Sequence, residues 1–283
     1  MSQKKTGSKI STKNINPLGL EVGYESSYNP QLLFPIKRLE KRVELGLEGS
    51  LPFIGEDIWN AYEISWLNNK GLPQVAIAEF RFQFDSENIV ESKSLKLYLN
   101  SLNQSVFSDR AMLEKTIAKD LSKVTNSNVL VSLLQLDETN NIQFFKAKNI
   151  DIQDIQIDNY SYQPDILANG REKQGLPVEE SLMSHLLKSN CLITNQPDWA
   201  SVLIEYSGQK ICEQSLLKYI VSFRTHNEFH EQCVERIYVD IMKYCKPEKL
   251  TVYARYTRRG GLDINPWRSN HLSTMENIRL SRQ

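Results

Sequence analysis

The sequence lacks the features that would place the protein in a membrane or outside the cell. The sequence has 283 residues, and no apolar stretch in it approaches the roughly 20 residues that a membrane-spanning helix needs. The cationic segment 1–13 has no apolar core of the kind found in secretory signals, so we expect no leader peptide. We therefore predict a cytoplasmic protein that has no contact with a membrane.

Cysteine is scarce, and its distribution excludes two common roles. All four cysteines lie in the second half of the chain, and no two have the CxxC spacing of zinc ligands or redox pairs. We expect reduced thiols, no disulfide framework and no bound metal. The four are Cys191, Cys212, Cys233 and Cys245.

An excess of charge of either sign is also missing. Lysine and arginine together number 34, and so do aspartate and glutamate, which gives a net charge of about zero. A nucleic-acid or membrane-surface protein usually carries a basic field, so these partners are disfavoured except at a local patch. The length suffices for one large domain or two modest ones.

The apolar pattern predicts two copies of a ββααββ module. Apolar residues alternate where strands are expected and recur at helical spacing where helices are expected. The first copy reads as a hairpin (58–66 with 76–84), helices over 91–102 and 110–123, and a second hairpin (129–136 with 142–147). The second copy repeats this order at an almost constant offset, so that 89–91 matches 211–213 and 129–136 matches the strand 251–256.

This repeat predicts an α+β protein of two tandem modules with antiparallel sheets. The expected divisions are a tail and packing arm (1–50), a first module (51–150), a connector (151–190) and a second module (191–283). Within the connector we expect a strand-like run at 151–158 and a helix over 178–188. A capping-box pattern at 225–228 predicts the start of the second module's long helix, with Phe229, Cys233, Ile237 and Ile241 as its buried stripe.

The polar residues of the two copies differ in a complementary way. The first copy has Glu91-Ser92-Lys93-Ser94, and the second has Cys191, Asp198 and His230-Glu231. This division favours one composite site, either between modules or between subunits. Each group also has a plainer interpretation, as a core thiol, a turn aspartate, a solvated helix start or a carboxylate favoured by a helix dipole.

Two local features bear on chemistry. Cys191 would follow the end of the helix expected over 178–188, where the dipole disfavours a thiolate, so its activation must come from elsewhere. The tip Arg258-Arg259-Gly260-Gly261 combines cations with unhindered backbone amides, which suits phosphate oxygens or forms a simple basic hairpin tip. No G-x-G-x-x-G follows a strand, so a nicotinamide cofactor would not be held by a Rossmann unit.

Four of these motifs resemble one enzyme family. The run 91–98, the loop from Cys191 to Asp198, Phe229-His230-Glu231 and the segment 258–266 resemble motifs of the NADPH-dependent 7-cyano-7-deazaguanine reductases (QueF), the nitrile reductases of queuosine biosynthesis. The match covers about 50–270, in the order of the long, bimodular type. Ala200 stands where the family often has glycine.

The resemblance implies two tunnelling-fold modules, a homodimer, no metal and no direct contact with nucleic acid. It implies that two NADPH reduce the nitrile of 7-cyano-7-deazaguanine to the aminomethyl group, through a covalent thioimide, for tRNA modification. Cys191 would be the nucleophile and Asp198 the proton relay. The implied substrate-binding residues are Val90, Glu91, Ser92, His230 and Glu231, and the implied NADPH-binding residues are Ser92, Lys93, Arg259 and Gly260.

Two other functions stay open on the residues alone. Cys191 with Glu231 and Lys93 are the residue types of a thiol-dependent nitrile or amide hydrolase. The tip 258–261 would suit a nucleobase-binding or RNA-binding module, although the balanced net charge counts against it.

Overall fold

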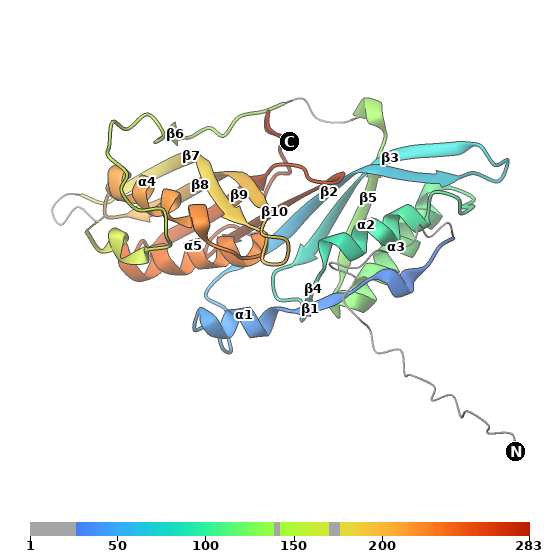
Figure 1. Cartoon of the computed structure of the whole chain (residues 1–283), viewed down its shortest axis with the longest axis horizontal. Coiled ribbons are helices and arrows are strands. Elements are labelled where there is room, and N and C mark those ends of the chain that lie inside the picture. The colour runs from blue at the N-terminus through green and yellow to red at the C-terminus, as the bar shows by residue number, and fades with distance from the viewer. Residues whose placement is uncertain (1–26, 139–141, 170–175) are drawn as a thin grey trace, which may run out of the picture.

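The computed structural model describes residues 27–138, 142–169 and 176–283. One long sheet dominates it, and Figure 1 shows helices against one side of that sheet. The sheet has eight strands in the order β5-β3-β2-β10-β9-β8-β7-β6. Every pair is antiparallel except β6 with β7, so the predicted α+β class with antiparallel strands is confirmed.

The first half supplies one end of this sheet and the helices above it, and its last strand, β6, lies at the opposite end beside β7. Its elements are η1 (Pro30–Leu32), β1 (Pro35–Lys37), α1 (Arg38–Glu44), β2 (Ile54–Leu67), β3 (Pro73–Gln83), β4 (Asn88–Val90), α2 (Ser92–Ser101), α3 (Arg110–Thr125), β5 (Val129–Leu134), η2 (Leu136–Glu138) and β6 (Lys148–Asn149). Strand β1 pairs with β4 outside the main sheet.

The second half supplies the other end. Its elements are η3 (Pro164–Asn169), β7 (Val178–Asn190), β8 (Pro197–Gly208), α4 (Glu213–Ser222), η4 (Phe223–Thr225), α5 (His230–Tyr244), β9 (Lys249–Tyr256) and β10 (Leu262–Ser269). Strand β10 pairs with β2, and this seam joins the two halves into one sheet.

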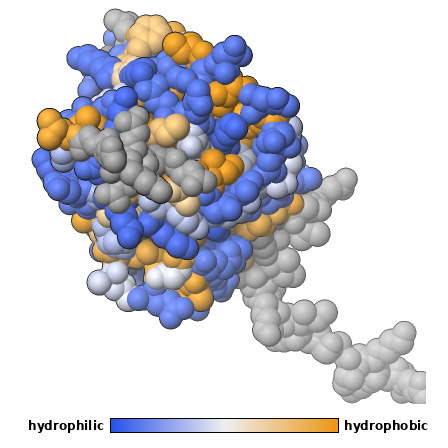
Figure 2. Space-filling model, turned by 90° about the vertical axis from the view of Figure 1, so that its left-hand side faces the viewer, coloured by the Kyte–Doolittle hydropathy of each residue, from blue (hydrophilic) through white to orange (hydrophobic). Residues whose placement is uncertain are grey.

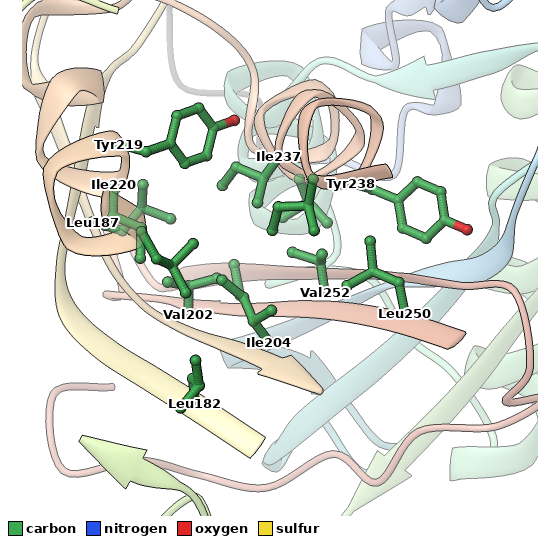
Figure 3. Packing of buried hydrophobic residues seen from close by; sticks show 14 of the residues in the cluster. Leu182, Leu187, Val202, Ile204, Tyr219, Ile220, Ile237, Tyr238, Leu250 and Val252 are labelled. Atoms are coloured by element: carbon green, nitrogen blue, oxygen red, sulfur yellow. The ribbon is translucent and has the colours of Figure 1, made fainter. Parts of the chain in front are cut away.

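Each half has its own apolar core between helices and sheet. In the second half, α4 and α5 pack on the strands, and Figure 3 shows Leu187, Val202 and Ile204 facing Tyr219 and Ile237. A comparable cluster lies under α2 and α3. The opposite face of the sheet carries a smaller cluster around Tyr253 and Trp267, covered by Leu272, Met275, Ile278 and Leu280 of the C-terminal segment.

The exterior is mostly polar at the end formed by the second half. Figure 2 shows hydrophilic side chains over most of that face, with hydrophobic ones scattered among them. Among the residues that the structure describes, no helix is both long and apolar enough to cross a bilayer.

The helix predicted over 178–188 is wrong, because this segment is strand β7. It pairs with β8 from Val178 opposite Gly208 to Asn190 opposite Pro197. An irregularity between Ser184 and Leu187 shifts the register, so Leu182 and Leu187 both face the core although their spacing is odd. The bulge thus imitates helical spacing. The predicted boundary at 190/191 falls between the two strands of this hairpin, and the exact division into modules stays a prediction.

Three other local predictions differ from the structure. The segment 142–147 forms only a bridge between Ile142 and Arg279, and its predicted turn at 139–141 lies outside the described residues. The run 151–158 forms no strand. Helix α5 begins at His230 rather than in the capping box at 225–228, because the Glu228 carboxylate accepts hydrogen bonds from Arg236 instead of capping a helix. Its predicted stripe of Cys233, Ile237 and Ile241 is buried.

Candidate active site

One pocket lies over the β2–β10 seam, between the two halves of the chain. It collects most of the residues that sequence reasoning selected, from the β4–α2 junction, the β7–β8 loop, the start of α5 and the loop before β10. The predicted residues that line it are Val90, Glu91, Ser92, Cys191, Asp198, His230, Glu231 and Arg259. Lys93 and Gly260 were also predicted, but they do not line this pocket. Residues expected at a composite site from both modules therefore line one pocket within a single chain.

Cys191 stands at the start of a tight turn between β7 and β8. Its backbone N–H donates to the carbonyl of Gln196 (2.8 Å), and its carbonyl accepts from the N–H of Asn195 (3.0 Å). Asn195 adopts the left-handed conformation (φ 55°) that such a turn needs. The predicted helix end before Cys191 does not exist, so no helix dipole acts on the thiol from that side.

The turn itself favours the thiolate. Burial of the half-exposed Cys191 would raise the pKa of its thiol, but hydrogen bonds from Thr194, from the amide of Ile193 and from Arg259 outweigh burial and lower this pKa below its ordinary value. Donors from the turn and a nearby guanidinium thus supply an activation that the sequence pattern did not reveal.

Asp198 occupies the second position of β8, opposite Ser189 of β7. It is buried, and its Oδ1 lies 3.0 Å from Nη1 of Arg259 and 3.6 Å from Nε2 of His230. The His230 ring is packed edge-on against Tyr256, with their centroids 4.1 Å apart. The carboxylate is therefore held between a guanidinium and an imidazole.

Glu231 brings a second carboxylate to the pocket from the first turn of α5. Its side chain is almost fully buried, with 2% relative exposure. Burial, followed by repulsion from the neighbouring Asp57 carboxylate, raises the pKa of Glu231 to about 7. This residue consequently changes charge near neutral pH, which suits a group that binds a ligand by accepting hydrogen bonds.

A chain of buried charges supports Glu231 from behind. Asp57 pairs with Arg38 and, at 2.9 Å, with Arg268. Arg268 also lies 2.8 Å from Glu235, which pairs with Arg42 at 2.6 Å. Burial would raise the pKa of Asp57, but the two arginines beside it keep that pKa lowered. Asp57 is therefore a permanent negative charge next to Glu231.

Glu91 has a structural task as well as a place in the pocket. It is the N-cap of α2, and its carboxylate accepts hydrogen bonds from the backbone N–H groups of Lys93 (2.9 Å) and Ser94 (2.7 Å). The arm fixes it further, because Phe34 accepts from the N–H of Glu91 and donates to Oγ of Ser94. A carboxylate has about four acceptor positions, so Glu91 keeps capacity for a ligand.

The glycine-rich tip lies beside this pocket, against α2. Gly260 and Gly261 have φ of 60° and 74°, which favour glycine. A Cβ at Gly260 would lie 3.1 Å from Nζ of Lys96. Burial, and then the charge of Arg259, lower the pKa of Lys96, so two cations share a confined space. In contrast, Arg258 turns away and stacks 4.7 Å above the ring of Tyr62.

Several lining residues were not selected from the sequence. Trp59 and Ile264 form a cross-strand pair beneath the pocket, and both lie in alternating strand patterns that are typical of core residues. Lys96 does not line this pocket but a second one, with Gly260 and Gly261; it follows Lys93 by three positions on α2, and this helical spacing was a signal that could have placed it near the tip. Ile193, Glu228 and Phe229 also line the pocket. Within the described part of the chain, no group of three or more His, Cys, Asp or Glu side chains could hold a metal.

Comparisons with known proteins agree with this geometry. An activated thiol beside a carboxylate in a small pocket is typical of enzymes that use covalent catalysis. A family model described as "Nitrile reductase, 7-cyano-7-deazaguanine-reductase N-term" matches residues 24–133, and one described as "QueF-like protein" matches 197–274. The NADPH-dependent 7-cyano-7-deazaguanine reductase of Colwellia psychrerythraea is 54% identical over 272 residues, covering 94% of this chain and 95% of that protein.

This chain therefore belongs to the family of NADPH-dependent 7-cyano-7-deazaguanine reductases. The resemblance seen in the sequence is confirmed, and with it the two-module tunnelling fold. A crystal structure of the archaeosine synthase QueF-Like in the apo form aligns with 35% of this chain and 99% of that chain, at 18% identity and a TM-score of 0.30.

Proposed function

We propose that this protein uses NADPH to reduce the nitrile of 7-cyano-7-deazaguanine to a primary amine, through a covalent thioimide on Cys191. Family membership supports the reaction, and one observation supports the covalent route. The Cys191 thiol has a lowered pKa and shares a pocket with Asp198 and Glu231. A nitrile accepts hydride poorly until a nucleophile has added to its carbon, so this thiol has a clear task.

The first step joins the Cys191 sulfur to the nitrile carbon. The C≡N triple bond becomes a C=N double bond, and the nitrogen takes up one proton. Asp198 would relay that proton by taking it from the Cys191 thiol and passing it to the nitrogen, with the ring of His230 and the guanidinium of Arg259 beside its carboxylate. The hydrogen bonds from Thr194 and Ile193 would hold the thiolate before the addition.

Recognition of the ring would fall to the two carboxylates. The aminopyrimidinone edge of the substrate presents N–H donors, and ionised Glu231 and Glu91, which both line the pocket, offer acceptors. Val90, Ser92 and His230 would complete the substrate contacts. The charge of Glu231 is sensitive to pH near 7, so binding should strengthen as this carboxylate ionises.

The NADPH phosphates would be held by Ser92, Lys93, Arg259 and Gly260. The residues of the tip fit this role. The side chain of Lys96 packs against Gly260, where a Cβ would meet it, and Lys96 lies close to the second cation, Arg259. Such a pair favours an anionic ligand. When bound, NADPH supplies one hydride for each of the two reduction steps.

The proposal extends to the assembly and the location of the protein. The family resemblance suggests a homodimer that works in the cytoplasm and does not bind nucleic acid directly. Light scattering on the purified protein at several concentrations tests the first point, since a mass of one chain at all concentrations would contradict a dimer.

Mass spectrometry of the protein mixed with the nitrile substrate, without NADPH, tests the covalent route. We expect a mass increase equal to that of the substrate in the wild type and in Cys212→Ala, which removes another half-buried thiol. Cys191→Ala should form no adduct. An adduct in Cys191→Ala would refute the assignment of the nucleophile.

The products separate the reductase from its alternatives. Addition of NADPH should yield amine, with two NADPH oxidised for each nitrile. Release of ammonia and a carboxylate without NADPH would instead identify a thiol-dependent hydrolase. Tight tRNA binding without turnover of the free base would identify a nucleic-acid module.

A further inference from the structure

Trp59 lies beneath the pocket, at the seam between the two modules. Its backbone pairs with Ile264 of β10, and both side chains line the pocket together with Cys191 and Glu231. The indole is buried, with 2% relative exposure, and packs edge-on against Phe82 at 5.4 Å between centroids. Its ring is therefore fixed in place.

The indole N–H of Trp59 has no hydrogen-bond partner among the described residues. A buried donor without a partner is costly, and a buried tryptophan nitrogen usually finds an acceptor. Trp267, which is equally buried, follows that rule, because its Nε1 donates to Glu56 at 3.4 Å. The N–H of Trp59 would therefore be stabilised by an acceptor from a ligand, since no described residue of the protein provides one.

The strand geometry places this donor near the ligand-binding carboxylate. Asp57 and Trp59 are two residues apart on β2, so their side chains lie on the same face of the sheet. Glu231, in the first turn of α5, lines the same pocket as Trp59 and is repelled electrostatically by Asp57. The indole and this carboxylate therefore belong to one pocket.

The other N–H side chains of the pocket lie against the carboxylate of Asp198, although Nη1 of Arg259 is, like the indole nitrogen of Trp59, a buried donor without a hydrogen-bond partner among the described residues. Arg259 and His230 both approach the carboxylate of Asp198, at 3.0 and 3.6 Å. The two glutamates can only accept while they are ionised. A ring that carries N–H groups beside a carbonyl would satisfy the glutamates with its donors and would leave its carbonyl oxygen in need of one donor.

We propose that the indole N–H of Trp59 donates a hydrogen bond to the ring carbonyl oxygen of the bound substrate, which makes Trp59 a specificity-determining residue. This inference rests on the proposed function. Its consequence is discrimination against deazapurines in which that carbonyl is absent, because such a ring would leave the buried N–H unpaired.

The test compares two proteins with two ligands. Trp59→Phe keeps an aromatic ring and removes the N–H, and a substrate analogue with C–H in place of the ring carbonyl removes the acceptor together with the neighbouring ring N–H, whose loss weakens binding in both proteins. In the wild type the analogue should have a higher KM than the substrate. In Trp59→Phe the KM for the substrate should rise about tenfold, as expected for the loss of one buried hydrogen bond. The penalty for the analogue should then be about tenfold smaller than in the wild type.

Trp66→Phe is the matched control, because Trp66 is buried on the same strand but lines a different pocket. It should leave both KM values unchanged, and thermal unfolding should show that both variants fold. Equal penalties for the analogue in the wild type and in Trp59→Phe would overturn the role of Trp59 while leaving the reductase intact. Failure of the wild type to form amine would overturn the proposed function, and the inference with it.

Discussion

Arg42 of the N-terminal arm lies 2.6 Å from the Glu235 carboxylate of helix α5, although the two are 193 residues apart in sequence. Arg38, four residues earlier, pairs with Asp57 of β2. The same arm contributes Phe34, whose backbone holds Glu91. One short segment thus ties together the elements that present both glutamates of the site, and Figure 1 shows α1 lying below α5 with β1 and β4 beside it.

Arg42→Met should be strongly destabilising. The change preserves much of the side-chain volume but leaves the buried Glu235 with Arg268 as its remaining cation, and breaking a buried ion pair costs about 3 kcal/mol. Urea unfolding of the full chain measures this loss. Lys41→Met is the control, because Lys41 pairs with Glu44 on the exposed side of the same helix and should cost less than about 1 kcal/mol. Equal losses in both variants would show that the buried network adds nothing.

Glu231→Gln should make stability less dependent on pH. The pKa of Glu231 is raised in the folded protein, from 4.5 to about 7, so folding favours its protonated form. The associated stability is fully present below about 4.5 and is lost as pH rises through about 7. Above pH 8 the glutamine variant should exceed the wild type by at least about 1.4 kcal/mol, the equivalent of one pKa unit. Substrate affinity of the wild type should fall as pH drops through 7, whereas the weaker affinity of the variant should stay flat.

Glu228→Gln provides a control of opposite sign. Burial would raise the pKa of Glu228, but His226 and Arg236 outweigh it and lower this pKa below the ordinary value. Its stabilising contribution is therefore present above about 4.5 and is lost as pH falls through the lowered value. Thermal unfolding between pH 5 and 8.5 should show Glu228→Gln less stable than the wild type throughout. If both variants shifted stability in the same direction at pH 8, the electrostatic account of Glu231 would be wrong.

The sequence allowed prediction of the elements whose apolar pattern is regular. The hairpin of β2 and β3 and the stripe of α5 appear as expected, because alternation and helical spacing report directly on burial. Strand β7 was mistaken for a helix, since its bulge between Ser184 and Leu187 breaks the alternation. A register shift depends on pairing with another strand, and no local pattern encodes it.

The residues of the pocket that belong to family motifs could be predicted from the sequence. Those that depend on contacts between distant parts of the chain could not. Cys191, Asp198 and Glu231 were selected correctly as neighbours, since their motifs are short and distinctive. The pairing of Arg42 with Glu235 joins distant parts of the chain, and the buried, unpaired N–H of Trp59 can be recognised only once its surroundings are known. Both belong to tertiary structure rather than to local sequence.

Arg259→Gln should raise the pKa of the Cys191 thiol. The guanidinium donates a hydrogen bond to Cys191, and this donation is one of the effects that lower the thiol pKa against the effect of burial. Without the cation, the thiolate should form at higher pH, so alkylation of Cys191 by iodoacetamide should slow near pH 7 and recover in more alkaline buffer. Peptide mass spectrometry across a pH series measures the rate at this cysteine alone. Arg258→Gln removes a neighbouring guanidinium that stacks on Tyr62 and should leave the profile unchanged. Identical profiles for Arg259→Gln and the wild type would mean that the donors of the turn, Thr194 and Ile193, activate the thiol without Arg259.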